Sequence, residues 1–145
     1  MKSYDEWTKD ELWDQVKMNF SGHMLLMYSF LRTKGVEPDE FTRYVAEHVL
    51  PGWKSEIATA ADLMNGILLN VLANGGGVRS IANTDIEITT IVSQLIEREI
   101  LETLDLEHDD TNQLWNKFIP IANALDMDFT WTERGDGDIQ LTVSR

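Results

Sequence analysis

Two histidines are the best candidates for acid–base chemistry in this sequence. His23 lies close to the apolar stripe of a first predicted helix, and His48 lies inside the apolar stripe of a second one, beside Tyr44. If these helices form an antiparallel hairpin that turns near Val36, both imidazoles face the same interhelical space. Imidazole titrates near neutral pH and binds metals, so the pair could act as a general base or contact a ligand. The alternative interpretation is two partly buried histidines that hydrogen-bond to backbone or tyrosine groups.

Glu99 is the matching candidate for a general acid. It falls in the middle of the apolar side of a predicted helix over residues 91–104. A carboxylate there is either paired or has a raised pKa suited to proton transfer. A helix rotated by some tens of degrees would instead leave Glu99 at the border of the apolar side. The candidate catalytic residues are therefore Glu99, His23 and His48, and without an HExxH pair we expect no metal and no cofactor.

Tryptophan is frequent in this chain, with five residues among 145. Trp13 and Trp115 fit apolar helix stripes, which predicts core positions for both. Trp53 follows a Pro-Gly pair and Trp131 lies on a predicted hairpin, so these two are candidates for lining a ligand cavity. The candidate ligand-binding residues are His23, Tyr44, His48, Trp53 and Trp131.

Three helices must position most of these side chains. Apolar periodicity predicts them over about residues 5–34, 39–50 and 55–74, with Lys34-Gly35 ending the first and Pro51-Gly52 ending the second. The first helix is apolar on two sides, and one stripe is assigned to the core. That core stripe consists of Trp13, Val16, Phe20, Met24, Met27 and Leu31, and the opposite side carries Trp7, Met18 and Leu25.

Alternation with a period of two predicts two β-hairpins later in the chain. They cover residues 78–81 with 85–92, and 129–132 with 139–143. Between them lie the helix over 91–104 and a fifth helix from Asp109 or Asp110 that Pro120 should kink or split. This segregated order predicts one α+β domain over residues 1–145. We expect about five helices, a four-stranded antiparallel sheet made of both hairpins, and a pocket between helices and sheet.

Composition excludes several classes of function. The chain has no cysteine, which rules out a disulfide framework, a cysteine-ligated zinc and a cysteine nucleophile. A formal net charge of −13 argues against direct binding to nucleic-acid phosphates or to an anionic membrane. The start lacks a signal-peptide pattern and the longest apolar run is too short to span a bilayer, so we expect a cytoplasmic protein. Residues 97–138 hold twelve acids against three bases, which is typical of a solvated face. The alternatives are a docking surface for a basic partner and a mimic of a nucleic-acid phosphate backbone.

A family resemblance is visible in the order of the elements and in two parts of the sequence. These parts are Ser21-Gly22-His23-Met24 with Gly35-Val36, and the segment from Asp126 to Val143. The chain resembles the bacterial L-2-amino-thiazoline-4-carboxylic acid hydrolase-like proteins, which are akin to the small-molecule-binding four-vinyl reductase domains. The resemblance implies a ligand-binding α+β fold that is often dimeric. Members commonly carry cysteines after the first hairpin and in the last one. This chain has Ile91-Val92-Ser93 and Ile139-Gln140-Leu141 there, so no catalytic residue is carried over.

Together these patterns favour a cytoplasmic domain that binds a small molecule in an apolar pocket. A hydrolase or another acid–base enzyme that uses the same pocket is the first alternative, and an acidic protein-interaction module is the second. The row of Trp7, Met18 and Leu25 on one side of the first helix also favours a homodimer through that side.

Overall fold

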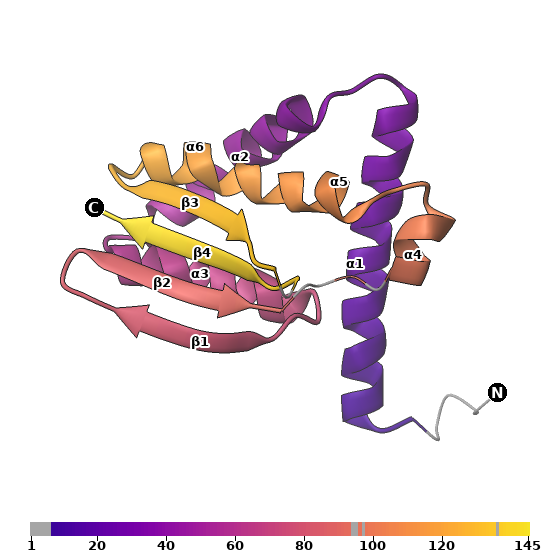
Figure 1. Ribbon diagram of the computed structural model, residues 1–145, viewed down its shortest axis with the longest axis horizontal. Helices are drawn as coiled ribbons and strands as arrows, with labels where there is room; N and C mark the ends of the chain where they lie inside the picture. Colours follow the sequence, from indigo (N-terminus) through magenta and orange to yellow (C-terminus); the bar gives the residue numbers. More distant parts are fainter. Residues whose placement is uncertain (1–6, 94–95, 97, 136) are drawn as a thin grey trace.

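A four-stranded antiparallel sheet lies against several helices, which confirms the predicted α+β class (Figure 1). The computed structural model describes residues 7–93, 96, 98–135 and 137–145. Its helical elements are α1 Lys9–Thr33, α2 Pro38–Lys54, α3 Ala60–Ala73, α4 Arg98–Thr103, α5 His108–Asn112, the 3₁₀ helix η2 Gln113–Lys117, and α6 Phe118–Asn123. Its strands are β1 Val78–Asn83, β2 Glu87–Val92, β3 Asp128–Glu133 and β4 Ile139–Ser144.

The two hairpins join into one four-stranded sheet, as predicted. The strand order is β1-β2-β4-β3, and the central pair β2·β4 is antiparallel with Ile88 opposite Val143 and Thr90 opposite Leu141. Alternate residues of β2 and β4 are buried, so the sheet has one covered face. Helix α3 packs on β2 and β4, and α6 packs on β3. The main core lies between this face and these helices, with Phe118, Leu63 and Leu141 among its most buried side chains.

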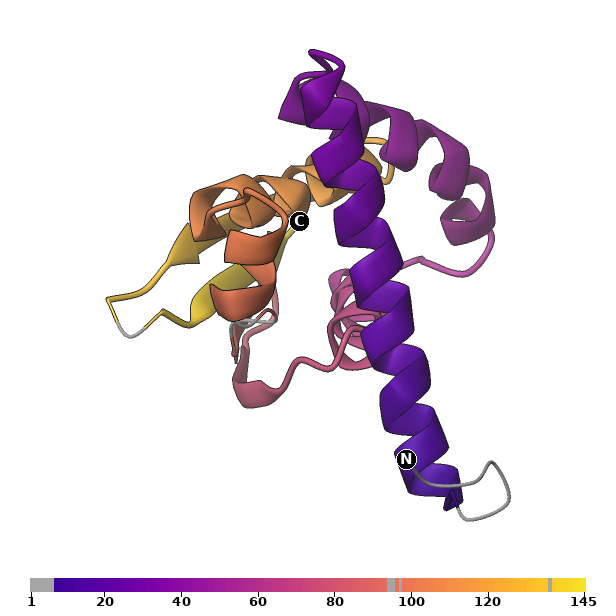
Figure 2. The ribbon, with the colours of Figure 1, turned by 90° about the vertical axis from the view of Figure 1, so that its right-hand side faces the viewer.

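Among the described residues, the buried side chains that anchor α1 lie in its C-terminal half. Leu25 and Tyr28 are its two buried residues, and they pack with Phe41 of α2, Leu101 of α4 and Leu114 of η2 in a second apolar cluster. The N-terminal end of the helix projects beyond the sheet and the other helices (Figures 1 and 2). Among the described residues, no helix combines the length and apolar character needed to cross a bilayer.

The predicted orientation of α1 is wrong for most of its core stripe, of which Met24 and Leu31 pack against the second apolar cluster. Trp13, which was assigned to the core, has 59% of its surface exposed, and Phe20 has 56% exposed. Leu25, which was assigned to a partner-binding side, is 1% exposed and belongs to the monomer core. Both sides of the helix are apolar, so periodicity alone does not identify the side that meets the body of the protein.

Helix boundaries differ from the prediction where packing acts against local sequence signals. α2 continues through Pro51 to Lys54, because Trp53 packs on the core and holds the last turn in place. The predicted fifth helix is split as expected, into α5, η2 and α6, with Pro120 tolerated in the first turn of α6. The start of the predicted helix over 91–104 falls partly on residues outside those described, and its described part is the short α4.

Capping boxes define the starts of two helices. Thr8 and Glu11 exchange hydrogen bonds at the start of α1, and Thr59 and Asp62 do so at the start of α3. Hydrogen bonds from the Thr59 side chain and then from the backbone N–H of Ala58 hold the pKa of Asp62 below its ordinary value. α3 therefore begins at residue 60 rather than at the predicted residue 55.

Candidate functional site

The 3₁₀ geometry of η2 aims two side chains toward α1. Residues three apart eclipse one another in a 3₁₀ helix, so Leu114 and Lys117 point the same way. Trp115 and the following Phe118 point toward the sheet instead and join the main core. A lysine therefore lies over an apolar layer, between the sheet and α1.

Two cavities meet at this lysine. The smaller one has about 50 Å³ of free space and opens between η2, α3 and α1. The larger one, of about 340 Å³, lies between α1, α2 and η2. Both are bordered by Met24, Leu114 and Lys117. The other residues of the larger cavity are Phe20, His23, Met27, Phe41, Thr42 and Val45.

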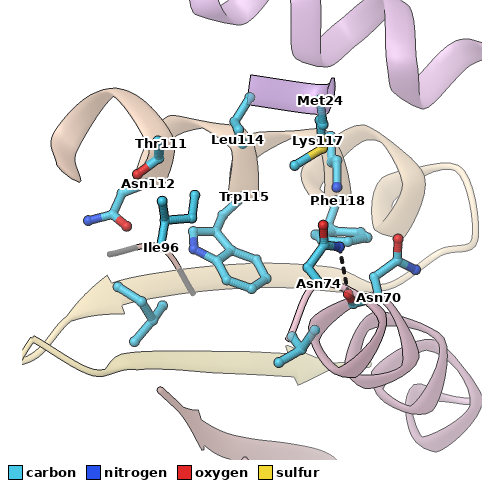
Figure 3. A pocket seen from close by; sticks show the side chains of 12 residues that line it. Met24, Asn70, Asn74, Ile96, Thr111, Asn112, Leu114, Trp115, Lys117 and Phe118 are labelled. Atoms are coloured by element: carbon cyan, nitrogen blue, oxygen red, sulfur yellow. Dashed lines mark hydrogen bonds between the residues drawn. The ribbon is translucent and has the colours of Figure 1, made fainter. Parts of the chain in front are cut away.

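Figure 3 shows the smaller cavity from close by. Lys117 and Met24 lie at one end, the indole of Trp115 enters from η2, and the amides of Asn70 and Asn74 enter from α3. The Asn74 side chain is fixed at both ends. Its Nδ2 donates to the Asn70 carbonyl oxygen at 2.7 Å, and its Oδ1 accepts from the Ser21 hydroxyl at 3.0 Å. The wall is therefore apolar with a few ordered polar groups, which is typical of ligand pockets.

Lys117 is the most perturbed titratable group at this site. Burial lowers the pKa of its ammonium group to about 8. Among the described residues it forms no ion pair and no hydrogen bond, and its nitrogen lies 4.9 Å from the centre of the Phe118 ring. A desolvated cation with no anion beside it in the described part of the chain is an unusual arrangement, given a net charge of −13.

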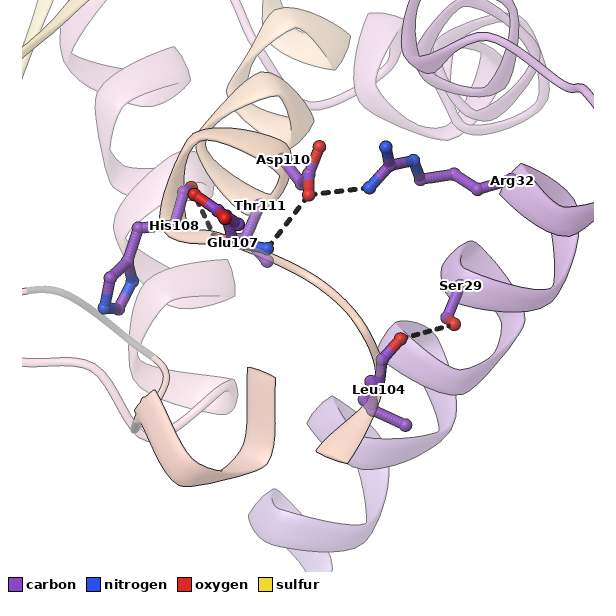
Figure 4. A network of polar contacts seen from close by, with 7 residues as sticks. All are labelled: Ser29, Arg32, Leu104, Glu107, His108, Asp110 and Thr111. Carbon is purple, nitrogen blue, oxygen red and sulfur yellow. Dashed lines mark hydrogen bonds and ion pairs between the residues drawn. The ribbon is translucent and has the colours of Figure 1, made fainter. Parts of the chain in front are cut away.

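A polar network holds α1 against the segment that carries η2 (Figure 4). The Arg32 guanidinium pairs with the Asp110 carboxylate at 2.6 Å, and the same carboxylate oxygen accepts the backbone N–H of Glu107 at 2.9 Å. The Ser29 hydroxyl donates to the Leu104 carbonyl oxygen at 2.9 Å. These contacts fix the distance between α1 and η2, and so the width of the space between them.

Tyr28 supports the wall of the larger cavity from behind. Its ring packs on Phe41, with 5.5 Å between ring centres. Its hydroxyl is buried and has no hydrogen-bond partner among the described residues. Burial raises the pKa of this hydroxyl, and the nearby Asp110 carboxylate raises it further.

The predicted histidine pair is placed differently from the expectation. His23 is exposed at the border of the larger cavity, and its Nδ1 donates to the Asn19 carbonyl oxygen at 2.6 Å. His48 is exposed on α2, where it stacks on Tyr44 with 4.1 Å between ring centres and donates to the Tyr44 carbonyl oxygen at 2.8 Å. Neither His48 nor Tyr44 borders either cavity. Of the five predicted ligand-binding residues, only His23 does so.

The two predicted cavity tryptophans have packing roles. Trp53 lies over Gly66 of α3 and packs on Phe118, with 5.8 Å between ring centres. The Trp131 indole N–H donates to the Asn116 side-chain oxygen at 2.8 Å. Both are partly buried, and neither borders one of the two cavities.

The predicted burial of Glu99 is wrong. It is exposed on α4, whose buried residue is Leu101. Residues two apart on an α-helix point about 200° from one another, so burial of Leu101 turns Glu99 outward. Glu99 and the two histidines therefore do not converge on either cavity. Among the described residues, no group of three His, Asp or Glu side chains is placed to hold a metal ion.

Sequence reasoning missed Lys117, and with it Asn70 and Asn74. One signal was available, since Lys117 is among only three bases in the acidic stretch 97–138 and lies beside an apolar helix stripe. No protein-family model matches this chain, and no curated protein matches it either. The resemblance noted from the sequence thus stays a prediction.

Proposed function

We propose that this protein binds a small apolar carboxylate, or a related organic anion, between α1, α2 and η2. The anionic group pairs with Lys117, and the apolar part occupies the larger cavity against Phe41 and Met24. One observation carries the proposal, namely the buried ammonium group of Lys117 without a described anion at the border of two apolar cavities.

The physical argument rests on desolvation. An ammonium group inside a protein is stabilised by an anion that displaces the remaining water, and such charge-assisted pairs are stronger than neutral hydrogen bonds. An uncharged ligand of the same shape leaves the Lys117 cation unpaired. The cavity of about 340 Å³ lies in the range of about 300–1,000 Å³ that is typical of small-molecule sites.

The geometry supports binding better than the predicted alternatives. An acid–base enzyme of the predicted kind needs its acid and base within hydrogen-bond or one-water reach of a common atom. Glu99 and His48 border neither cavity, so that route has no support from the geometry. The acidic interaction module and the cytoplasmic location stay predictions from composition.

Two matched pairs of probes test the proposal by isothermal titration calorimetry. Octanoate and 1-octanol share a chain, as do 3-phenylpropionate and 3-phenylpropanol, and each pair differs mainly in the anionic group. At pH 7 we expect the better carboxylate to bind at least tenfold more tightly than its alcohol. Lys117→Met should reduce that ratio to within about twofold, and Lys54→Met, at an exposed lysine of α2, should leave it unchanged.

The pH dependence gives an independent readout. Anion binding raises the pKa of Lys117 from about 8, so the protein takes up a proton on binding. Carboxylate affinity should therefore fall as the pH rises from 7 to 9.5, whereas alcohol affinity should stay constant. A carboxylate that binds no better than its alcohol, or binds equally well to Lys117→Met, would overturn the proposal.

A further inference from the structure

A continuous apolar seam runs along the outer side of α1. Five of its side chains are between 50% and 59% exposed, and the sixth, His23, is exposed as well. The seam carries no Asp, Glu, Lys or Arg. We define the α1 seam as Trp13, Val16, Phe20, His23, Met27 and Phe30.

The spacing of the α1 seam is that of a helix-pairing surface. Its members alternate at intervals of three and four residues, which is the pattern of the apolar positions of a heptad. The buried residues of α1, Leu25 and Tyr28, point to a different side of the helix. The body of the protein therefore leaves the seam largely exposed, and only Phe20, His23 and Met27 border the larger cavity.

We propose that the α1 seam pairs with the same seam of a second copy, in an antiparallel homodimer. The pattern is self-complementary in that orientation. If the twofold axis passes between residues 21 and 22, Trp13 faces the second copy's Phe30, Val16 faces its Met27, and Phe20 faces its His23. Each seam residue meets another seam residue, and this is the requirement for an isologous interface.

The size of the seam fits a second copy. Aromatic side chains bury about 150–250 Å² when they are fully covered. Six large side chains that are half exposed thus offer on the order of 600 Å² per protomer, and the flanking Leu12 and Leu26, at 49% and 55% exposed, add to it. A standard stable interface needs about 800 Å² per partner.

The placement of the body on α1 selects the antiparallel orientation. The N-terminal end of α1 projects beyond the body, and the C-terminal half carries the second apolar cluster (Figure 2). In an antiparallel pair each projecting end lies along the second copy's anchored half. A parallel pair would instead place the two bodies side by side.

The inference is independent of the proposed ligand, although the two sites adjoin. Phe20, His23 and Met27 belong to the seam and also border the larger cavity. In the antiparallel pair, the second copy's Val16 and Phe20 come to lie beside that border. The dimer therefore shields one side of the cavity from water.

Light scattering with one matched pair of variants tests the interface. At about 50 µM the wild type should have a mass near twice 16.6 kDa. Phe20→Glu should give a mass near 16.6 kDa with an unchanged circular dichroism spectrum. Met18→Glu is the control, because Met18 lies on another side of the same helix and is 65% exposed. It should remain dimeric.

The chain contains no cysteine, so cross-linking gives a clean test of orientation. An oxidised mixture of Val16→Cys and Met27→Cys proteins should form a disulfide-linked pair, and oxidised Val16→Cys alone should not. Two copies of residue 16 lie about 16 Å apart along the axis in the antiparallel pair, at 1.5 Å per residue. Efficient cross-linking of Val16→Cys alone would overturn the antiparallel arrangement. A wild-type mass of 16.6 kDa, or a Phe20→Glu variant that remains dimeric, would overturn the dimer itself.

Discussion

Replacing Lys117 with methionine should make this protein more stable at neutral pH. The pKa of Lys117 falls from 10.5 to about 8 in the folded protein. Each pKa unit corresponds to about 1.4 kcal/mol, so keeping the ammonium charged in the fold costs about 3 kcal/mol. Methionine has a similar length and no charge. It loses the contact with the Phe118 ring, which is worth about 1 kcal/mol. The expected net gain in the free energy of unfolding is about 2 kcal/mol at pH 7.

The sign of the pH dependence follows from the same shift. Because the pKa of Lys117 is lower in the folded state, the unfolded chain binds more protons between pH 8 and pH 10.5. The wild type therefore gains stability as the pH rises through that window. Below pH 8 the folded protein carries the full free-energy cost of keeping the Lys117 ammonium charged. The stability advantage of Lys117→Met should thus be constant up to about pH 8 and shrink from there to pH 10.5.

Urea unfolding followed by tryptophan fluorescence measures this difference at pH 7, 8, 9 and 10, at one protein concentration. Lys54→Met is the control, because Lys54 is exposed at the end of α2 and loses no desolvation penalty. Its free energy of unfolding should stay within about 0.5 kcal/mol of the wild type. A Lys117→Met variant that is less stable than the wild type at pH 7, by an amount independent of pH, would show that the ammonium is paired in the folded protein. That result would refute the reasoning.

Three further predictions follow from individual contacts. Tyr28→Phe removes a buried hydroxyl that has no described partner, so thermal denaturation should show equal or higher stability, and a loss above 1 kcal/mol would reveal a hydrogen-bond partner. Gly22→Ala should stabilise α1 by about 1 kcal/mol, because the added Cβ meets open space. Gly66→Ala should destabilise the protein, because its Cβ would lie 3.3 Å from the Trp53 ring. Equal effects of the two substitutions in urea unfolding would contradict this. Octanoate should lower the dissociation constant of the dimer in sedimentation experiments, since the α1 seam borders the larger cavity; an unchanged constant would show that the two sites are uncoupled.

Local patterns were sufficient to predict the sheet. The alternation of Ile139, Leu141 and Val143 specifies the inward face of β4, and the Gly-rich turn before it specifies the hairpin. Antiparallel hairpins depend on neighbouring residues and turn chemistry, both of which are readable from one sequence. The same local logic located the break in the fifth helix near Pro120.

The candidate site was harder to predict from the sequence than the sheet, because its geometry depends on long-range packing. The direction of Lys117 is set by the 3₁₀ geometry of η2, and the sequence pattern there fits an α-helix as well. The burial of Glu99 was predicted from a helix over residues 91–104, but packing of Leu101 turns α4 so that Glu99 is exposed. His48 was paired with His23 on the assumption of a straight helical hairpin, whereas α2 leaves the end of α1 at an angle (Figure 1).

The reversed assignment of α1 has a physical cause that connects the fold to the proposed dimer. A helix that only covers its own core needs one apolar stripe, and α1 has two. The stripe with Leu25 and Tyr28 is used by the monomer. The stripe with Phe20 and Met27 is the more regular of the two, because it keeps the intervals of three and four residues over more than two heptads. Strict spacing of this kind is what pairing with another helix requires, whereas packing on an irregular core surface does not require it. The α1 seam shares Trp13, Val16, Phe20 and Met27 with the stripe predicted to be core, but has His23 and Phe30 in place of Met24 and Leu31. Its strict spacing is therefore better explained by a second copy of the same helix.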